Sequence, residues 1–147
     1  MRRTLLIAVG TLVFLAIALL IGRYLSTESR ERAAIDRVLN AQARGDAAGM
    51  LVALDGSCRA DPRCRATVVA DARRLRRAGT PKIIAYDSKT AYALGTATGV
   101  TRVAWTIVGH GLPVVQCVVV RRGGSVIAGR TVRLLRISAP IGNESTC

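Results

Sequence analysis

Side chains that act as bases near neutral pH are almost absent from this chain. Among its 147 residues there is one histidine, His110, which lies in the glycine-rich stretch "GHGLP". A nucleophilic cysteine needs a base, and that base needs a third group that orients it. No such group accompanies His110, so we expect it to be an exposed loop residue. We predict no catalytic residue and no cofactor.

Two kinds of binding are excluded by what else is scarce. Tetrahedral zinc sites favour cysteines about two to four residues apart, and no gap between Cys58, Cys64, Cys117 and Cys147 fits that spacing. We therefore predict no metal site. Single-stranded nucleic acids stack on aromatic side chains, of which the chain has one tryptophan, one phenylalanine and three tyrosines. We expect no nucleic-acid partner.

Acidic residues are also few. The chain has 9 of them against 22 basic residues, which gives a net charge of +13 at pH 7. All the basic residues are arginines except Lys82 and Lys89. A field of this sign attracts polyanions such as anionic lipid headgroups or acidic wall polymers.

One long apolar run stands out at the N-terminus. The segment from Leu5 to Ile21 has no charge, and as a helix it would rise roughly 25 Å, which nearly spans a hydrocarbon core. Arg23 and Tyr24 follow, where snorkelling and aromatic anchoring are expected. A cleaved signal peptide has a shorter apolar region and an Ala-x-Ala site, which "LLIGRYL" lacks. We predict an uncleaved signal anchor over residues 1–25, with a signal peptide as the alternative.

Two features of the sequence favour opposite orientations of this anchor. Four arginines between Arg23 and Arg37 follow the apolar segment, whereas only Arg2 and Arg3 precede it, and the positive-inside rule then favours a cytoplasmic C-terminal domain. The short N-terminal flank and the cysteines favour the opposite orientation. We predict a single-pass protein of a bacterial cytoplasmic membrane with its domain outside. A cytoplasmic domain with reduced thiols is the alternative.

Helical patterns follow the anchor. The first helix is expected to begin at Ser26 or Thr27, to hold Glu28 and Glu31 in its favourable first turns, and to end at Gly45. Side chains at spacings of three and four form its buried stripe. These are Ala34, Ile35, Val38, Leu39 and Gln42.

Two more helices are expected before residue 80. Asp46 is a good N-cap for a short helix, "DAAGMLVALD". Asp61 followed by Pro62 is a strong start for another, which would run to a C-cap at Gly79. The last turns of this helix would hold four arginines. They are Arg73, Arg74, Arg76 and Arg77. Such a cluster is either a solvated face that complements the helix dipole or a contact site for anionic lipids or polymers.

After Pro81 the pattern changes to about five strands with short connections, which favour antiparallel pairing in sequence order. Turns are expected at Asp87–Ser88, at Gly99 and at Gly123–Gly124, and Gly129 is expected to make a bulge or a bend inside the last strand. Helices followed by a curved antiparallel sheet make an α+β domain over residues 26–138. Residues 139–147 form a C-terminal tail.

This order of elements resembles a known superfamily. A helix ending in "ARGDAAGMLVALD", a further helix and a strand meander are similar to the cone fold of nuclear transport factor two, ketosteroid isomerase and the polyketide cyclases, over residues 28–138. A transmembrane helix joined to such a cone also resembles the membrane proteins associated with mammalian-cell-entry lipid transport systems of actinobacteria. The resemblance implies a ligand or partner surface on the concave face of the sheet, which residues such as Trp105 and Ile107 or their neighbours would line.

The four cysteines permit three pairings, and the sequence does not choose among them. Cys58 and Cys64 flank the short stretch "RADPR", and pairing them leaves Cys117 with Cys147. The second bond would fasten the tail onto the sheet. In the chain-entropy model it stabilises the domain by about 3 to 4 kcal/mol.

These features predict a membrane-anchored binding or assembly module of the cell envelope without catalytic activity. Its expected partners are the membrane, envelope proteins and anionic lipids or polymers, and its oligomeric state is not predicted. The alternative is an isomerase or cyclase that acts on a small apolar ligand in the cone. Such an enzyme uses an acid and a tyrosine in its pocket, but Asp87, between Tyr86 and Tyr92, is expected in a turn.

Overall fold

A computed structural model describes residues 2–90, 95–109, 111–125 and 129–147. Within these residues four helices precede four strands, so the predicted α+β class is confirmed. The helices are α1 (Arg2–Arg44), α2 (Ala47–Ala53), α3 (Gly56–Ala60) and α4 (Pro62–Arg74). The strands are β1 (Lys82–Ser88), β2 (Ala97–Thr106), β3 (Val114–Ser125) and β4 (Gly129–Ile137).

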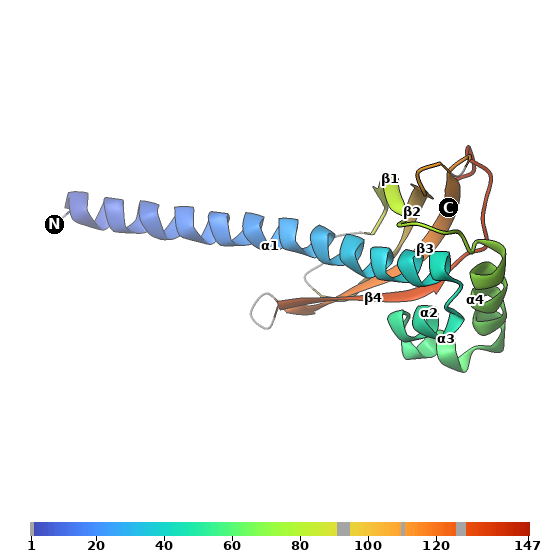
Figure 1. Ribbon diagram of the computed structural model, residues 1–147. Coiled ribbons are helices and arrows are strands. Elements are labelled where there is room, and N and C mark those ends of the chain that lie inside the picture. The colour runs from blue at the N-terminus through green and yellow to red at the C-terminus, as the bar shows by residue number, and fades with distance from the viewer. Residues whose placement is uncertain (1, 91–94, 110, 126–128) are drawn as a thin grey trace.

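Helix α1 is one uninterrupted helix of 43 residues. Its N-terminal half extends away from the rest of the protein, while its C-terminal half packs along the sheet (Figure 1). By length and composition it is the one helix among the described residues that could cross a membrane. The prediction of a separate helix that begins at Ser26 or Thr27 is wrong. No proline separates the apolar segment from these positions, and the single Gly22 does not end the helix, so α1 continues through them.

The turn from α1 into α2 follows the prediction. Gly45 ends α1 with a φ of 74°, a conformation that glycine adopts without steric cost. Asp46 then caps α2, because its side chain accepts a hydrogen bond from the backbone N–H of Gly49 at 2.8 Å. Helix α3 was not expected from the sequence. Asp55 caps it by accepting from the N–H of Ser57 at 3.0 Å.

Helix α4 begins as predicted, with Asp61 as N-cap and Pro62 at the first position, but it ends before Gly79. Its last residue is Arg74, and the Leu75 side chain turns into the core. The backbone N–H of Arg77 donates to the carbonyl of Ala43 in α1 at 2.9 Å. The chain beyond α4 therefore pairs with the end of α1 instead of continuing its own helix.

The sheet is antiparallel with the order β1-β2-β3-β4, one strand fewer than expected. Gly99 lies inside β2, opposite Val120, and Gly123 lies inside β3, opposite Thr131, so the turns predicted at these glycines are wrong. A Cβ at position 99 would lie 2.4 Å from the Cα of Thr90, so this glycine permits close packing instead of a turn.

Other predicted boundaries in the sheet also shift. Asp87 and Ser88 belong to β1, where they pair with Arg102 and Thr101, so no turn lies there. Gly129 begins β4 and makes no bulge inside it. Part of the predicted strand "TAYALGTAT" and the histidine at position 110 lie outside the described residues.

The core lies between the helices and one face of the sheet, which we call the inner face. Ile35 and Leu39 of α1 are fully buried there, as is Trp105 of β2. Alternate residues of β3 and β4, among them Val120 and Leu134, complete the packing. Strands β3 and β4 run alongside the C-terminal half of α1 (Figure 1).

The C-terminal tail lies across the opposite, outer face of the sheet. The N–H of Ile141 donates to the carbonyl of Val115 at 2.8 Å, which forms an isolated bridge to β3. Arg102 of β2 holds the next part of the tail, because its guanidinium donates to the carbonyls of Asn143 and Ser145. The tail is therefore held to β3 by its backbone and to β2 by the Arg102 side chain.

Both favoured disulfides are present. Cys58 bonds to Cys64 with their Cα atoms 5.3 Å apart, and Cys117 bonds to Cys147 with a Cα separation of 5.7 Å. The second bond fixes the end of the tail to β3. All four cysteines are therefore used in crosslinks, which leaves none as a nucleophile or a metal ligand.

The two disulfides should differ in what they contribute to stability. In the Cys117→Ser/Cys147→Ser variant the free energy of unfolding should fall by about 3 to 4 kcal/mol, because a long loop of the unfolded chain is no longer closed. The matched Cys58→Ser/Cys64→Ser variant opens a much shorter loop and should lose about 2 kcal/mol. Urea unfolding of the detergent-solubilised chain measures both values. Equal losses would contradict the role assigned to the tail.

Candidate functional site

The inner face of the sheet, where a ligand was expected, contains a buried ion pair. Glu31 of α1 and Arg122 of β3 are 0% and 2% exposed. The Nη2 and Nε atoms of Arg122 lie 2.7 and 2.8 Å from Oε2 of Glu31, so two N–H groups of the guanidinium donate to the same carboxylate oxygen. Nη2 also donates to Oγ of Ser88 at 3.0 Å, and Nη1 donates to the carbonyl of Thr90 at 3.4 Å.

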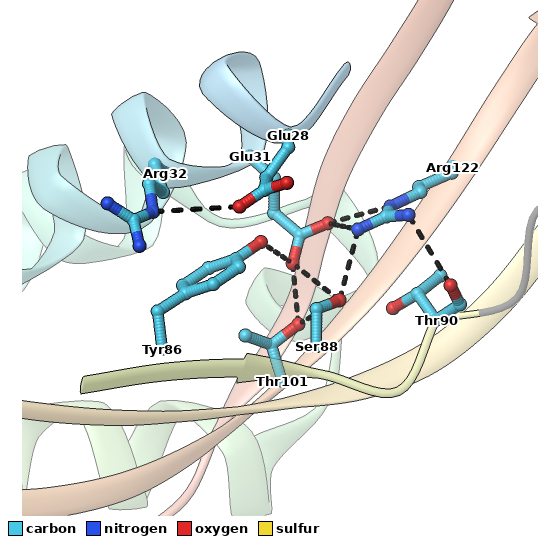
Figure 2. Close-up of polar contacts among 8 residues, drawn as sticks. All are labelled: Glu28, Glu31, Arg32, Tyr86, Ser88, Thr90, Thr101 and Arg122. Atoms are coloured by element: carbon cyan, nitrogen blue, oxygen red, sulfur yellow. Dashed lines mark hydrogen bonds and ion pairs between the residues drawn. The ribbon is translucent and has the colours of Figure 1, made fainter. Parts of the chain in front are cut away.

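Hydroxyl groups of β1 and β2 complete the coordination of the carboxylate (Figure 2). Tyr86 and Thr101 donate to Oε1 of Glu31 at 2.7 and 2.5 Å. Burial, together with the adjacent Glu31 carboxylate, raises the pKa of the Tyr86 phenol above its usual value. Arg32 covers the tyrosine ring from outside, with its guanidinium carbon 4.8 Å from the ring centroid. Tyr86 is therefore held as a neutral hydrogen-bond donor.

The cluster joins α1 to three strands at once. Placing Glu31 in the first turns of a helix was wrong, because α1 begins far upstream, at Arg2. The Glu31 side chain is buried against the sheet. Its position could have been recognised from the spacing to Ile35, since residues four apart share a helix face. Arg122 could have been recognised in the same way. Alternate residues of a strand face the same side, so Arg122 lies on the buried side together with Val118 and Val120.

A second buried polar cluster is centred on Gln116 of β3. Its Oε1 accepts from Nε1 of Trp105 at 2.9 Å and from Nε2 of Gln42 in α1 at 3.1 Å. Its Nε2 donates to the carbonyl of Ser138 at 2.9 Å and to Oδ2 of Asp71 in α4 at 3.3 Å. One amide therefore links α1, α4, two strands and the start of the tail.

Asp71 is an unusual carboxyl group because it is 2% exposed. Burial raises its pKa from 3.8 to about 6, although Arg74 and the hydrogen bond from Gln116 both act in the opposite direction. Desolvation disfavours the charged form of a buried acid. The folded domain therefore holds a proton on Asp71 more tightly than the unfolded chain does.

The predicted anion-contact cluster lies at the end of the domain remote from the apolar segment. Only Arg73 and Arg74 belong to α4, whereas Arg76 and Arg77 follow it beside the end of α1. From Ile21 to the end of α1 the helix rises about 35 Å. Headgroup charges act over a screening length of about 10 Å, so a membrane crossed by α1 is out of reach of this cluster.

A different basic surface lies along the side of α1. Two adjoining hollows of about 590 and 270 Å³ share Arg37 and Ala53 in their linings. Arg44 and Val52 line the first, and Arg59 lines the second. We call this surface the arginine groove. The sequence analysis missed it, because its residues come from α1, α2 and α3, and α3 was not expected.

Comparisons of the chain with protein-family models, curated proteins and solved structures find no match. The function is therefore inferred from the geometry of this chain alone.

The buried ion pair should be costly to break on one side only. In Arg122→Met the Glu31 carboxylate stays buried without its cation, and the free energy of unfolding should fall by about 3 to 5 kcal/mol. The double variant Glu31→Gln/Arg122→Met should be more stable than Arg122→Met, because the Gln amide oxygen still accepts from Tyr86 and Thr101 without a buried charge. Chemical unfolding in detergent measures this. A double variant less stable than Arg122→Met would be the contrary result.

The raised pKa of Asp71 makes stability depend on pH. As pH rises from 4.5 to 7.5, through the pKa of about 6, the wild type should lose stability relative to Asp71→Asn, because the folded state must release a tightly held proton. The gap should grow from about 1 kcal/mol at pH 4.5 to at most about 3 kcal/mol at pH 7.5. Thermal unfolding at both pH values measures it, with the exposed Asp87→Asn as control. A gap that is the same at both values would show that Asp71 does not titrate in this range.

Proposed function

We propose that this chain is a membrane-anchored module, without catalytic activity, that holds a binding surface at a fixed height and orientation outside the membrane for the assembly of an envelope complex. The observation that carries the proposal is the continuity of α1. One helix runs from the exposed apolar segment into the core of the domain, where Glu31 and Gln42 bind it to the sheet. A domain built around its own anchor cannot turn independently of that anchor.

The two disulfides support the extracytoplasmic orientation. Disulfides persist in oxidising compartments and are rare where thiols are kept reduced. The helix supports a membrane location, and the disulfides support the outer side of that membrane. This outweighs the positive-inside count, because the charge rule is a bias, whereas a structural disulfide requires its redox environment.

The burial of the acids favours an assembly role over an isomerase or cyclase. In an acid–base enzyme the carboxyl group must reach the proton of a bound substrate. Glu31 is 0% exposed and occupied by Arg122, Tyr86 and Thr101, and Asp71 is 2% exposed beneath Gln116. The cone-like arrangement of helices and curved sheet that we propose is therefore filled by its own side chains on this face.

The orientation can be tested with the two lysines, which are both exposed on the domain. In intact spheroplasts a membrane-impermeant amine reagent should label Lys82 and Lys89, as located by peptide mass spectrometry, and the unreduced protein should contain no free thiol. In mild detergent the chain from its native membrane should migrate in a complex much larger than its 15.6 kDa.

The control is the Lys82→Arg/Lys89→Arg variant, which keeps the charge and should lose the domain label. Labelling of the wild type only after permeabilisation, together with four free thiols, would overturn the extracytoplasmic orientation. A protein that migrates alone in every mild detergent would overturn the assembly role.

A further inference from the structure

The arginine groove has a regular arrangement of unneutralised cations. Arg37 and Arg44 are seven residues apart on α1, which places them on one side of the helix about 10 Å apart. Arg59 of α3 adds a third positive charge. Among the described residues, none of these three arginines forms an ion pair, whereas the neighbouring Arg133 is paired with Asp55 at 3.3 Å.

Small apolar residues lie between these cations. Ala41 of α1 and Gly49 and Ala53 of α2 line the groove, so a partner backbone could approach closely. Val52 beside them is 73% exposed, although it is a large apolar side chain. Cations that flank a small, apolar strip fit a segment with acidic and apolar residues on the same face.

The position of the groove disfavours the lipid surface as its ligand. From Ile21 the helix rises about 20 Å to Ala34, which lines one end of the groove, and about 35 Å to Arg44, which lines the other. Both heights exceed the screening length of about 10 Å. The groove therefore stands above the headgroups and runs along the helix axis.

The charge of the chain disfavours a second copy as the occupant. With a net charge of +13, two copies repel each other, and a self-contact would bring the groove arginines of both together. An acidic protein segment meets both the charge and the height of the groove.

We infer that the arginine groove binds an acidic amphipathic helix of a partner protein, which lies along α1 with carboxylates two turns apart facing Arg37 and Arg44. The inference rests on the proposed function, since it names the surface and the chemistry of the partner that the anchored domain presents. A helix is the fitting conformation because its two-turn rise reproduces the spacing of the arginines on α1.

The test uses the full chain in zwitterionic detergent and a synthetic helical peptide of about 20 residues as the probe. The peptide has glutamates at every seventh position beside alanine and leucine, and a control peptide has the same composition with the glutamates on all faces. The first peptide should bind and the control should bind at least about tenfold more weakly. Arg37→Glu/Arg44→Glu should weaken binding of the first peptide by about tenfold or more, because two attractive contacts become repulsive.

The matched control is Arg63→Glu/Arg73→Glu, which makes the same change in net charge at two exposed arginines of α4. It should leave peptide affinity within about threefold, and circular dichroism should show both variants folded. Arg37→Gln/Arg44→Gln, which removes charge without reversing it, should give an intermediate loss. Equal weakening by the two charge reversals, or equal binding of the two peptides, would overturn the inference.

Vesicles containing phosphatidylglycerol form a further arm. If the chain binds them and Arg37→Glu/Arg44→Glu abolishes that binding while peptide affinity is unchanged, lipid is the ligand and the inference fails. If neither peptide binds while the lysine labels and the native complex are as expected, the inference fails and the proposed function stands. Failure of the labels and the complex with peptide binding intact would remove the proposed function alone.

Discussion

The buried ion pair between Glu31 and Arg122 is the interaction on which the arrangement of this protein depends. It is fully buried and draws β1, β2 and β3 to one turn of α1. A buried pair of this kind adds little net stability compared with apolar packing, yet it strongly penalises any arrangement that separates the charges. Its effect is therefore on specificity. A helix that could otherwise slide or rotate against an apolar sheet is held in one register.

The two faces of the sheet are covered by different means. On the inner face, α1 contributes both apolar side chains and polar anchors, Glu31 and Gln42. On the outer face the C-terminal tail is held by Arg102 and by its disulfide to Cys117. Ordering a tail of this kind costs about 1 to 2 kcal/mol of backbone entropy per residue. The bond from Cys147 to Cys117 supplies the missing constraint, which explains a cysteine at the centre of a valine-rich strand.

Local signals predicted the fold where the decisive interaction is local. Asp46 and Asp61 cap helices through their own neighbouring N–H groups, so their sequence context was sufficient. The turn predicted at Gly99 is wrong, because this glycine permits the close approach of Thr90. Such a contact between two segments leaves no local pattern in the sequence. The prediction for Glu31 was wrong for the same reason. A glutamate early in a helix is usually solvated. Here Arg122 on β3 offsets the cost of removing the carboxylate from water. The arginine groove also required knowing how three helices meet.

Some arginines are paired within the protein and others are not, and this difference follows from the same constraints. Arg122 is committed to the core, and Arg102, Arg133 and Arg136 hold the tail or the acids of the α3 region. With so few acidic residues in the chain, most of the other arginines cannot be neutralised internally. Those on the exposed side of α1 share its rigid attachment to the sheet, so their spacing is fixed before any partner arrives. Preorganised charge costs less conformational entropy on binding than charge on a mobile loop. A continuous anchor helix therefore determines how well the groove can recognise a matching row of carboxylates.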